Sequence, residues 1–231
     1  GTIDKYMGDA IMAFWNAPVE MADHAAQACH AALEMQQAVK DLNAKLKAEA
    51  ESVELPEGQN RRRYVPIQVG VGLNTDDCCV GNMGSDQRFD YSALGDGVNL
   101  GSRLEGQSKT YGVDIVLGEN TAELVKEEFA IIELDLLQVK GKTEPVRIFA
   151  LLGDKKMRES AEFQQLEQLI DRILSKYRNQ EWNKSLELLN KLKNNEKDLQ
   201  SFAKLLISRI VAFQQQSPPV DWDGVAIATS K

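Results

Sequence analysis

The sequence contains little cysteine, few aromatic residues and fewer basic than acidic side chains. Of its 231 residues, 3 are Cys and 6% are aromatic, and 27 Lys and Arg stand against 35 Asp and Glu, a formal net charge of -8. An odd number of cysteines with no Cys-x-x-Cys spacing argues against a disulfide framework or a zinc site, so we expect a reducing, cytoplasmic location. The acidic balance argues against nucleic acid as a general partner, because that binding needs clustered Lys and Arg.

Long apolar runs are also absent. No stretch of about 18 apolar residues occurs and no basic-then-apolar leader opens the chain, so we expect this segment neither to span nor to contact a membrane. The chain begins at Gly1, not Met, and a strand-like segment follows almost at once. We therefore expect a piece of a longer polypeptide, which leaves open a membrane anchor in a missing N-terminal region.

What is present is globular composition, with 43% hydrophobic and 27% charged residues. In the first two thirds, apolar alternation and helical periodicity follow each other along the chain. The pattern predicts strands at 9–15, 64–75 and 113–118, a long helix at 22–50, a hairpin from 76, a loop from 88 leading into a helix, a short helix after 118, and two strands within 129–153. Strands mixed with helices indicate an α+β domain at 1–153.

The pattern of apolar residues changes after about residue 155. Helical periodicity runs from 161 to 214, with polar breaks near 179–180 and 194–195, so two or three helices are expected. The stretch "YRNQEWNKSLELLNKL" is similar to one helix junction of a tetratricopeptide repeat, although no 34-residue period is found. The closing "PPVDWDGVAIATSK" predicts a short strand. Residues 154–231 are thus predicted to form a helical extension, with a repeat-like arrangement as an open alternative.

Two pairs of polar residues carry the chemistry. In "YSALGDGVNLGSRLEG", Asn99 and Arg103 are four apart, which places both on one helix face as donors for a ribose oxygen and a phosphoryl oxygen. The alternative is that Asn99 caps the helix while Arg103 is solvated or pairs with Glu105. In "DKYMGDAIMAFW", Lys5 and Asp9 flank a Met-Gly bend, where a surface ion pair or ordinary turn chemistry is the alternative.

Three blocks in order give these pairs a common meaning. "GTIDKYMGDAIMAFWNAP", "DYSALGDGVNLGSRLE" and "VKGKTEPVRIFAL" together resemble the catalytic domain of class III adenylate cyclases, over residues 1 to about 152. The resemblance implies a ferredoxin-like α+β domain whose active sites lie at a homodimer interface. It also implies the substrate ATP, two Mg²⁺ or Mn²⁺ ions per site, and 3′,5′-cyclic AMP and pyrophosphate as products for intracellular signalling.

The resemblance carries over residue by residue. Asp9 matches the second of the family's two metal-binding aspartates, and Lys5 matches the lysine that reads adenine. Ser92 stands where the family has a threonine or aspartate that also reads the base. Asn99 matches the asparagine that orients the ribose, and Arg103 the arginine that stabilises the pentavalent phosphorus. In the family, the metal aspartates come from one protomer and the other residues from its partner.

A lysine in "KGK" matches the family's ligand for the terminal phosphates. We assign this role to Lys142, although Lys140 is close enough to be an alternative.

The chemistry of the bases agrees with ATP. Adenine presents an acceptor at N1 and a donor at N6, which Lys5 and the Ser92 hydroxyl can satisfy, whereas guanine presents the reverse pattern. A guanylate cyclase is therefore the weaker alternative. A second alternative is a catalytically incomplete regulatory or interaction module, because the family's first metal aspartate lies upstream of the position equivalent to Gly1. We expect the isolated chain to be inactive or nearly so.

Smaller departures from the family pattern remain. Asp76 stands where a glycine is usual, and Gly97 and Gly101 replace better helix formers, each at a cost of up to about 1 kcal/mol if helical. The adjacent Cys78 and Cys79 should face opposite sides of a strand, one of them toward the core.

Overall fold

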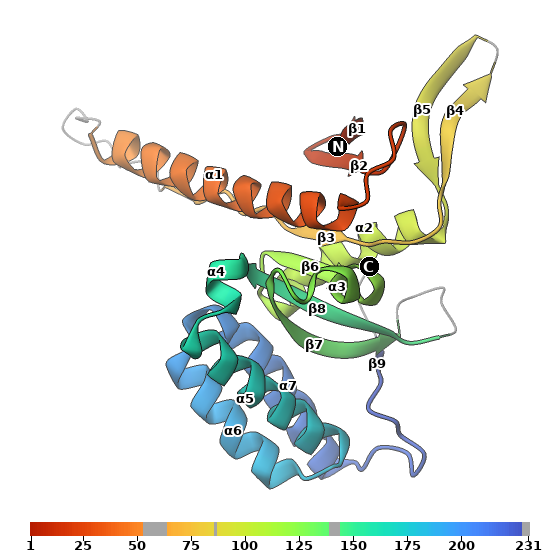
Figure 1. Ribbon diagram of the computed structural model, residues 1–231. Helices are drawn as coiled ribbons and strands as arrows, with labels where there is room; N and C mark the ends of the chain where they lie inside the picture. Colours follow the sequence, from red (N-terminus) through yellow and green to blue (C-terminus); the bar gives the residue numbers. More distant parts are fainter. Residues whose placement is uncertain (53–63, 86, 139–143, 228–231) are drawn as a thin grey trace, which may run out of the picture.

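The computed structural model describes residues 1–52, 64–85, 87–138 and 144–227, and its ribbon is drawn in Figure 1. Its elements are β1 (Thr2–Met7), β2 (Ala10–Phe14), α1 (His24–Ser52), β3 (Val71–Leu73), β4 (Cys79–Ser85), β5 (Arg88–Leu94), α2 (Asp96–Tyr111), β6 (Ile115–Gly118), α3 (Glu119–Val125), β7 (Ala130–Gln138), β8 (Val146–Gly153), α4 (Lys155–Arg158), α5 (Ala161–Arg178), α6 (Trp182–Asn195), the 3₁₀ turn η1 (Lys197–Leu199), α7 (Gln200–Gln215) and β9 (Ala226–Ile227).

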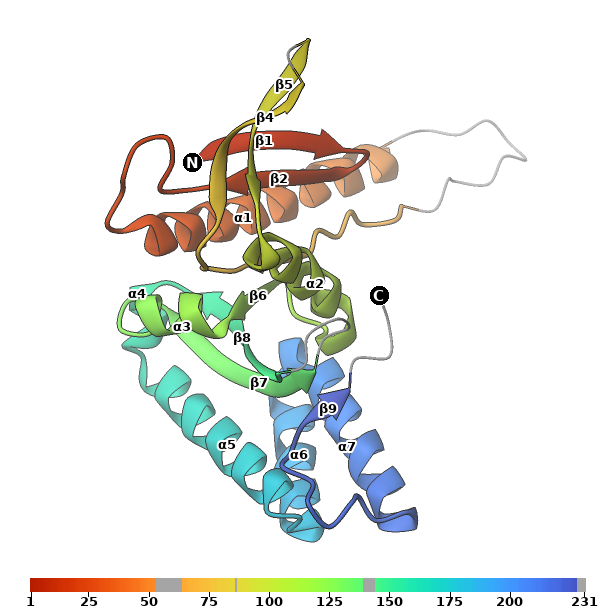
Figure 2. The ribbon, with the colours of Figure 1, turned by 90° about the vertical axis from the view of Figure 1, so that its right-hand side faces the viewer.

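A five-stranded mixed sheet in the order β3-β6-β8-β7-β9 forms the centre. β3 runs parallel to β6, β8 is antiparallel to both β6 and β7, and β9 runs parallel to β7 at the far edge. Alternating side chains of β6 divide between two cores, because successive strand residues face opposite sides. Ile115 and Leu117 pack toward α1 and α3, while Val116 packs toward α2 and α5 to α7. Figure 2 shows α1 above the sheet and α5 to α7 below it.

Helix α1 is long because few breakers interrupt it, but only its first half is covered. Its buried residues end at Gln36, and most of them are alanines, whose small side chains allow close packing. The second half extends past the sheet (Figure 1). There, Asn43 receives a hydrogen bond from the Ile67 backbone at 2.8 Å, so the chain after residue 64 runs back along the helix.

The C-terminal helices share a core with the sheet. The buried cluster that contains Val116 also holds Phe163 of α5, Leu189 of α6 and Phe202 of α7. At the end of α5, Arg178 binds the carboxylate of Glu133 on β7. The extension therefore packs directly on the sheet instead of lying apart from it.

A buried polar triad joins the extension to helix α2. The Tyr111 hydroxyl, at the last residue of α2, donates to Asp135 Oδ2 at 2.6 Å, and Arg209 of α7 binds the same carboxylate. Asp135 is 1% exposed. Burial, and then the charge of Asp135, raises the pKa of Tyr111 well above its usual range. The triad fixes the C-terminal end of α2 against β7 and α7.

Two hairpins lie outside the central sheet. β1 pairs with β2 through the two-residue turn Gly8-Asp9, and β4 pairs with β5. Gly8 has a φ of 66°, a conformation that suits glycine in such a turn. The rings of Phe14 and Tyr91 bring the two hairpins together, with centroids 5.9 Å apart.

Several predicted elements differ in the structure. The strand expected at 64–75 is only Val71–Leu73, because the Ile67 and Val69 carbonyls accept hydrogen bonds from the α1 side chains Asn43 and Gln36 instead of from a neighbouring strand. The loop expected from 88 is the strand β5. The prediction that one of Cys78 and Cys79 faces the core is wrong, since β4 stands away from the sheet and both are exposed.

The remaining predicted elements are confirmed, including the short terminal strand and the helices between 161 and 215, of which two or three were expected and three are found. Within the described part of the chain, every helix is either too short or too polar to cross a bilayer.

Candidate active site

Helix α2 carries Asn99 and Arg103 one turn apart. Asn99 is exposed and Arg103 is half-buried. Neither side chain forms a hydrogen bond or ion pair with another described residue, so Asn99 does not cap the helix and Arg103 does not pair with Glu105. The capping role of Asn99 and the Arg103–Glu105 pair are therefore wrong, whereas a half-buried Arg103 without a protein partner still fits the alternative of a solvated side chain. The amide and the guanidinium keep their donors available for a ligand.

The start of α2 is fixed by backbone geometry. Gly95, the residue before the helix, has a φ of 152°, which L side chains rarely adopt. Asp96 follows in the first turn, where its charge favours the helix dipole, but no side chain caps this end. The amide of Asn74 donates to the Gly97 carbonyl at 3.1 Å and ties the helix to the loop after β3.

Two departures from the family pattern explain each other here. A Cβ atom at Gly97 would lie 2.4 Å from Asp76 Cβ, which is too close for any side chain. Asp76 therefore requires glycine at position 97, and the helix-weakening residue compensates for the unusual aspartate. Nothing in the structure explains Gly101, because a Cβ there would meet only the Asn74 Cβ at 3.9 Å.

Lys5 and Ser92 meet through a third residue, Asp4, which the sequence interpretation missed. The Ser92 hydroxyl donates to Asp4 Oδ2 at 2.6 Å, and Lys5 Nζ lies 3.4 Å from Asp4 Oδ1. The Asp4 side chain is fully buried, whereas that of Lys5 is 43% exposed. Side chains alternate along a strand, so Asp4 faces the same, less exposed side of β1 as Thr2. A charged residue at such a position is the signal that could have identified it.

Asp9 occupies the tip of the β1-β2 hairpin and is exposed. The alternative of a Lys5–Asp9 ion pair is wrong, because Lys5 pairs with Asp4. The carboxylate of Asp9 is accessible to a hard divalent cation, which prefers oxygen ligands. No group of three or more candidate metal ligands occurs among the described residues, and the metal-binding role of Asp9 remains a prediction.

Lys142 and its alternative Lys140 lie outside the described residues. The assignment of the terminal phosphates to Lys142 remains a prediction.

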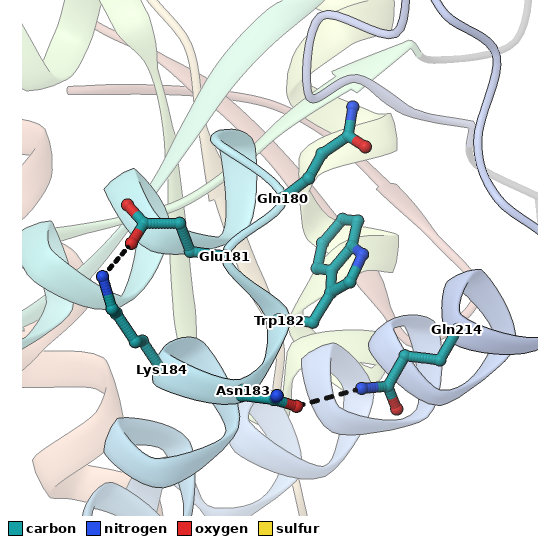
Figure 3. Close-up of a pocket in the computed structure, with 6 residues that line it drawn as sticks. All are labelled: Gln180, Glu181, Trp182, Asn183, Lys184 and Gln214. Carbon is teal, nitrogen blue, oxygen red and sulfur yellow. Dashed lines mark hydrogen bonds and ion pairs between the residues drawn. The ribbon is translucent and has the colours of Figure 1, made fainter.

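Two hollows lie away from these residues. One of about 350 Å³ is lined by the turn before α6, the first turn of α6 and the end of α7 (Figure 3). Its polar groups pair with one another, since Lys184 binds Glu181 at 2.5 Å and Gln214 donates to Asn183 at 3.4 Å. A second, of about 200 Å³, lies between β7, β8 and α5. Neither contains a predicted site residue.

Comparison with known proteins gives a consistent result. The family model described as the adenylate and guanylate cyclase catalytic domain matches residues 4–153. Adenylate cyclase 1 of Rhizobium meliloti is 32% identical over 153 residues, covering 66% of this chain and 21% of that protein. The adenylate cyclase of Anabaena cylindrica is 34% identical over 152 residues, covering 64% of this chain and 28% of that protein. The chain thus spans less than a third of these relatives.

Solved structures agree on the fold. The adenylyl cyclase CyaB from P. aeruginosa has a TM-score of 0.54 and 30% identity, covering 66% of this chain and 71% of that chain. The guanylyl cyclase Cya2 has a TM-score of 0.53 and 30% identity, covering 67% of this chain and 71% of that chain. The expected α+β cyclase fold is confirmed.

Proposed function

The chain belongs to the adenylate and guanylate cyclase family, and we propose that it is an adenylate cyclase, which converts ATP into 3′,5′-cyclic AMP and pyrophosphate. The observation that carries this proposal is that Asn99 and Arg103 project from one face of α2 with no protein partner in the described chain, directly after the strand that carries Ser92. The names of the similar Rhizobium and Anabaena proteins support the same activity.

The base is proposed to be read by Lys5 and Ser92. Lys5 donates to N1 of adenine, and the Ser92 hydroxyl accepts from the 6-amino group. Guanine would present N1–H to the ammonium of Lys5 and leave buried polar groups unpaired. Such a mismatch costs roughly 10⁴-fold in specificity where a site is built to hydrogen-bond its substrate. The similarity to both CyaB and Cya2 does not decide between the bases, so the choice of ATP depends on these two residues.

The proposed reaction forms one bond and breaks another at the α-phosphorus. The ribose 3′ oxygen loses its proton and attacks phosphorus, while the bond to the β-phosphate oxygen breaks and pyrophosphate leaves. Asn99 orients the ribose, and Arg103 places fixed positive charge where negative charge develops on the phosphoryl oxygens. A bound Mg²⁺ or Mn²⁺ pair would supply charge stabilisation to the entering and leaving oxygens, with Asp9 as the ligand from this chain.

We propose that two copies form each site, with Asp9 from one and the remaining residues from the other. Large apolar side chains on the two hairpins support an interface there: Tyr6 is 68%, Phe89 64% and Ile11 56% exposed. Since this chain offers Asp9 without the family's other metal aspartate, we expect the 231 residues alone to make little or no cyclic AMP. Activity tests therefore use the protein at its full natural length.

Replacing Arg103 tests the transition-state role. Arg103→Ala should lower kcat for cyclic AMP formation by about 10² to 10³-fold, because the loss of one donor to a developing negative charge typically lowers kcat by that factor. Lys109→Ala is the matched control, because Lys109 is an exposed cation two turns further along the same helix. Product is measured by chromatography of the nucleotides. Equal activity of the Arg103 variant and wild type would remove Arg103 from the reaction.

Mixing two inactive variants tests the shared site. Asp9→Asn removes the metal carboxylate from both sites of its homodimer, and Arg103→Ala removes the arginine from both. A dimer with one subunit of each variant has one site with both residues intact and one site with neither. Equal amounts that exchange subunits freely should recover about a quarter of wild-type activity. If both variants are stable dimers that exchange subunits and no activity returns, Asp9 and Arg103 do not belong to different protomers.

A further inference from the structure

The contact between Asp4 and Ser92 bears on how the base is distinguished. Asp4 is fully buried on β1, at the point where the register of the β1-β2 pair shifts between Ile3 and Lys5. Burying a carboxylate costs several kcal/mol unless it is paired. Here one oxygen accepts from the Ser92 hydroxyl at 2.6 Å, and the other accepts no hydrogen bond from a described residue but lies 3.4 Å from Lys5 Nζ.

The direction of this hydrogen bond settles what Ser92 can do. A serine hydroxyl has one hydrogen and two lone pairs, whereas a carboxylate only accepts. The Ser92 hydrogen is therefore committed to Asp4, and only lone pairs remain for a third group. Ser92 is 4% exposed, so water competes little with Asp4 for the hydroxyl hydrogen, and a base that reaches the lone pairs must displace neighbouring atoms.

We propose that Asp4 is a positioning residue that holds the Ser92 hydroxyl as an acceptor and thereby makes the site selective for a 6-aminopurine. The inference rests on the proposed function and adds the residue that fixes the orientation of the Ser92 hydroxyl hydrogen. Without Asp4, the serine hydroxyl could turn and donate to a 6-oxo group as readily as it accepts from a 6-amino group. With Asp4 in place, the lone pairs of a 6-oxo group would face the lone pairs of the Ser92 hydroxyl, and no hydrogen bond could form between them.

The variant Asp4→Asn should reverse this direction. The amide oxygen of the new side chain would face the ammonium of Lys5, because opposite charges attract, and its NH₂ would face Ser92. Ser92 would then accept from the amide and present its hydrogen to the base. Asp4→Ala is the second variant, which removes the constraint on the Ser92 hydroxyl and puts no new polar group in place of the carboxylate.

The test compares ATP with inosine triphosphate, the analogue, which has a 6-oxo group and a protonated N1. The N1 difference faces Lys5 in every variant, so a change in the ratio reports the Ser92 side of the base. In the protein at its full natural length, the ratio of kcat/KM for ATP to that for the analogue should fall about tenfold or more in Asp4→Asn, in Asp4→Ala and in Ser92→Ala. In the double variant Asp4→Ala/Ser92→Ala the ratio should fall no further than in Ser92→Ala alone. Asp114→Asn, an exposed aspartate after α2, should leave the ratio unchanged.

The outcomes separate this inference from the proposed function. If the wild type makes cyclic AMP and Ser92→Ala lowers the ratio, but both Asp4 variants keep it, Asp4 only ties β1 to β5 and the inference is wrong. If the Asp4 variants lose thermal stability but the ratio is unchanged, the same conclusion holds. If the wild type cyclises neither nucleotide, the proposed function fails and the inference with it.

Discussion

The two ends of helix α2 lie in opposite environments. In its N-terminal half, Asn99 is exposed, Arg103 is half-buried, and neither side chain has a partner among the described residues. At its C-terminal end, Tyr111 is completely buried and shares Asp135 with Arg209. The comparison shows how a site is kept open on a rigid element: the free side chains belong to a helix whose other end is held by the C-terminal extension.

The largest expected effect concerns the anchored end. Arg209→Met should lower the free energy of unfolding by about 3 kcal/mol or more, because it leaves the carboxylate of Asp135 buried without its cation. Arg172→Met, on the exposed surface of α5, should change stability by no more than about 0.5 kcal/mol. Urea unfolding followed by circular dichroism measures both. Equal losses in the two variants would mean that the triad does not anchor α2.

A smaller effect is expected at the open end, where Gly97 meets Asp76. Gly97→Ala should cost about 1 to 3 kcal/mol, because the new Cβ overlaps the Asp76 side chain. Gly106→Ala, in the same helix but with nothing within 4 Å, should instead gain up to about 1 kcal/mol. Adding Asp76→Gly to Gly97→Ala should restore stability. If it does not, the two residues do not compensate for each other.

The smallest expected effect is a difference in alkylation between buried and exposed cysteine thiols. Burial raises the pKa of Cys29 to about 12, and this thiol is completely buried on the face of α1 that packs against the sheet. Iodoacetamide at pH 8 should therefore modify Cys78 and Cys79 in the folded protein and Cys29 only after denaturation. Mass spectrometry of the alkylated peptides reports this. Modification of Cys29 at the rate of the exposed pair would show that α1 opens readily.

The sequence predicted those parts of the fold that have strong local patterns. The helix at 22–50 and the three C-terminal helices follow from apolar spacing and lie within a few residues of their observed positions. The strand at 64–75 was too long, since the alternation of "YVPIQVGV" carries no sign that α1 side chains bind that backbone. The exposure of both Cys78 and Cys79 could not be read from alternation, because it depends on the hairpin leaving the sheet.

The candidate site was predictable only where a motif names it. Helical spacing places Asn99 and Arg103 on one face, and the family resemblance assigns their roles. The meeting of Lys5 and Ser92 depends instead on the packing of two hairpins, and these two residues are 87 positions apart in sequence. Asp4 has only the alternation of its own strand as a signal, and nothing in the sequence relates it to Ser92 on the other hairpin. The extension's contact with α2 likewise joins Tyr111 to Arg209, which no local pattern relates.

Product identity under competition tests the central claim most directly. The protein at its full natural length is given equal concentrations of ATP and GTP with Mg²⁺ or Mn²⁺, and both cyclic nucleotides are quantified by mass spectrometry. The account predicts that cyclic AMP exceeds cyclic GMP by roughly 10⁴-fold, because Lys5 and Ser92 match adenine and oppose guanine. Comparable amounts of the two products, or no cyclic nucleotide at all, would contradict it.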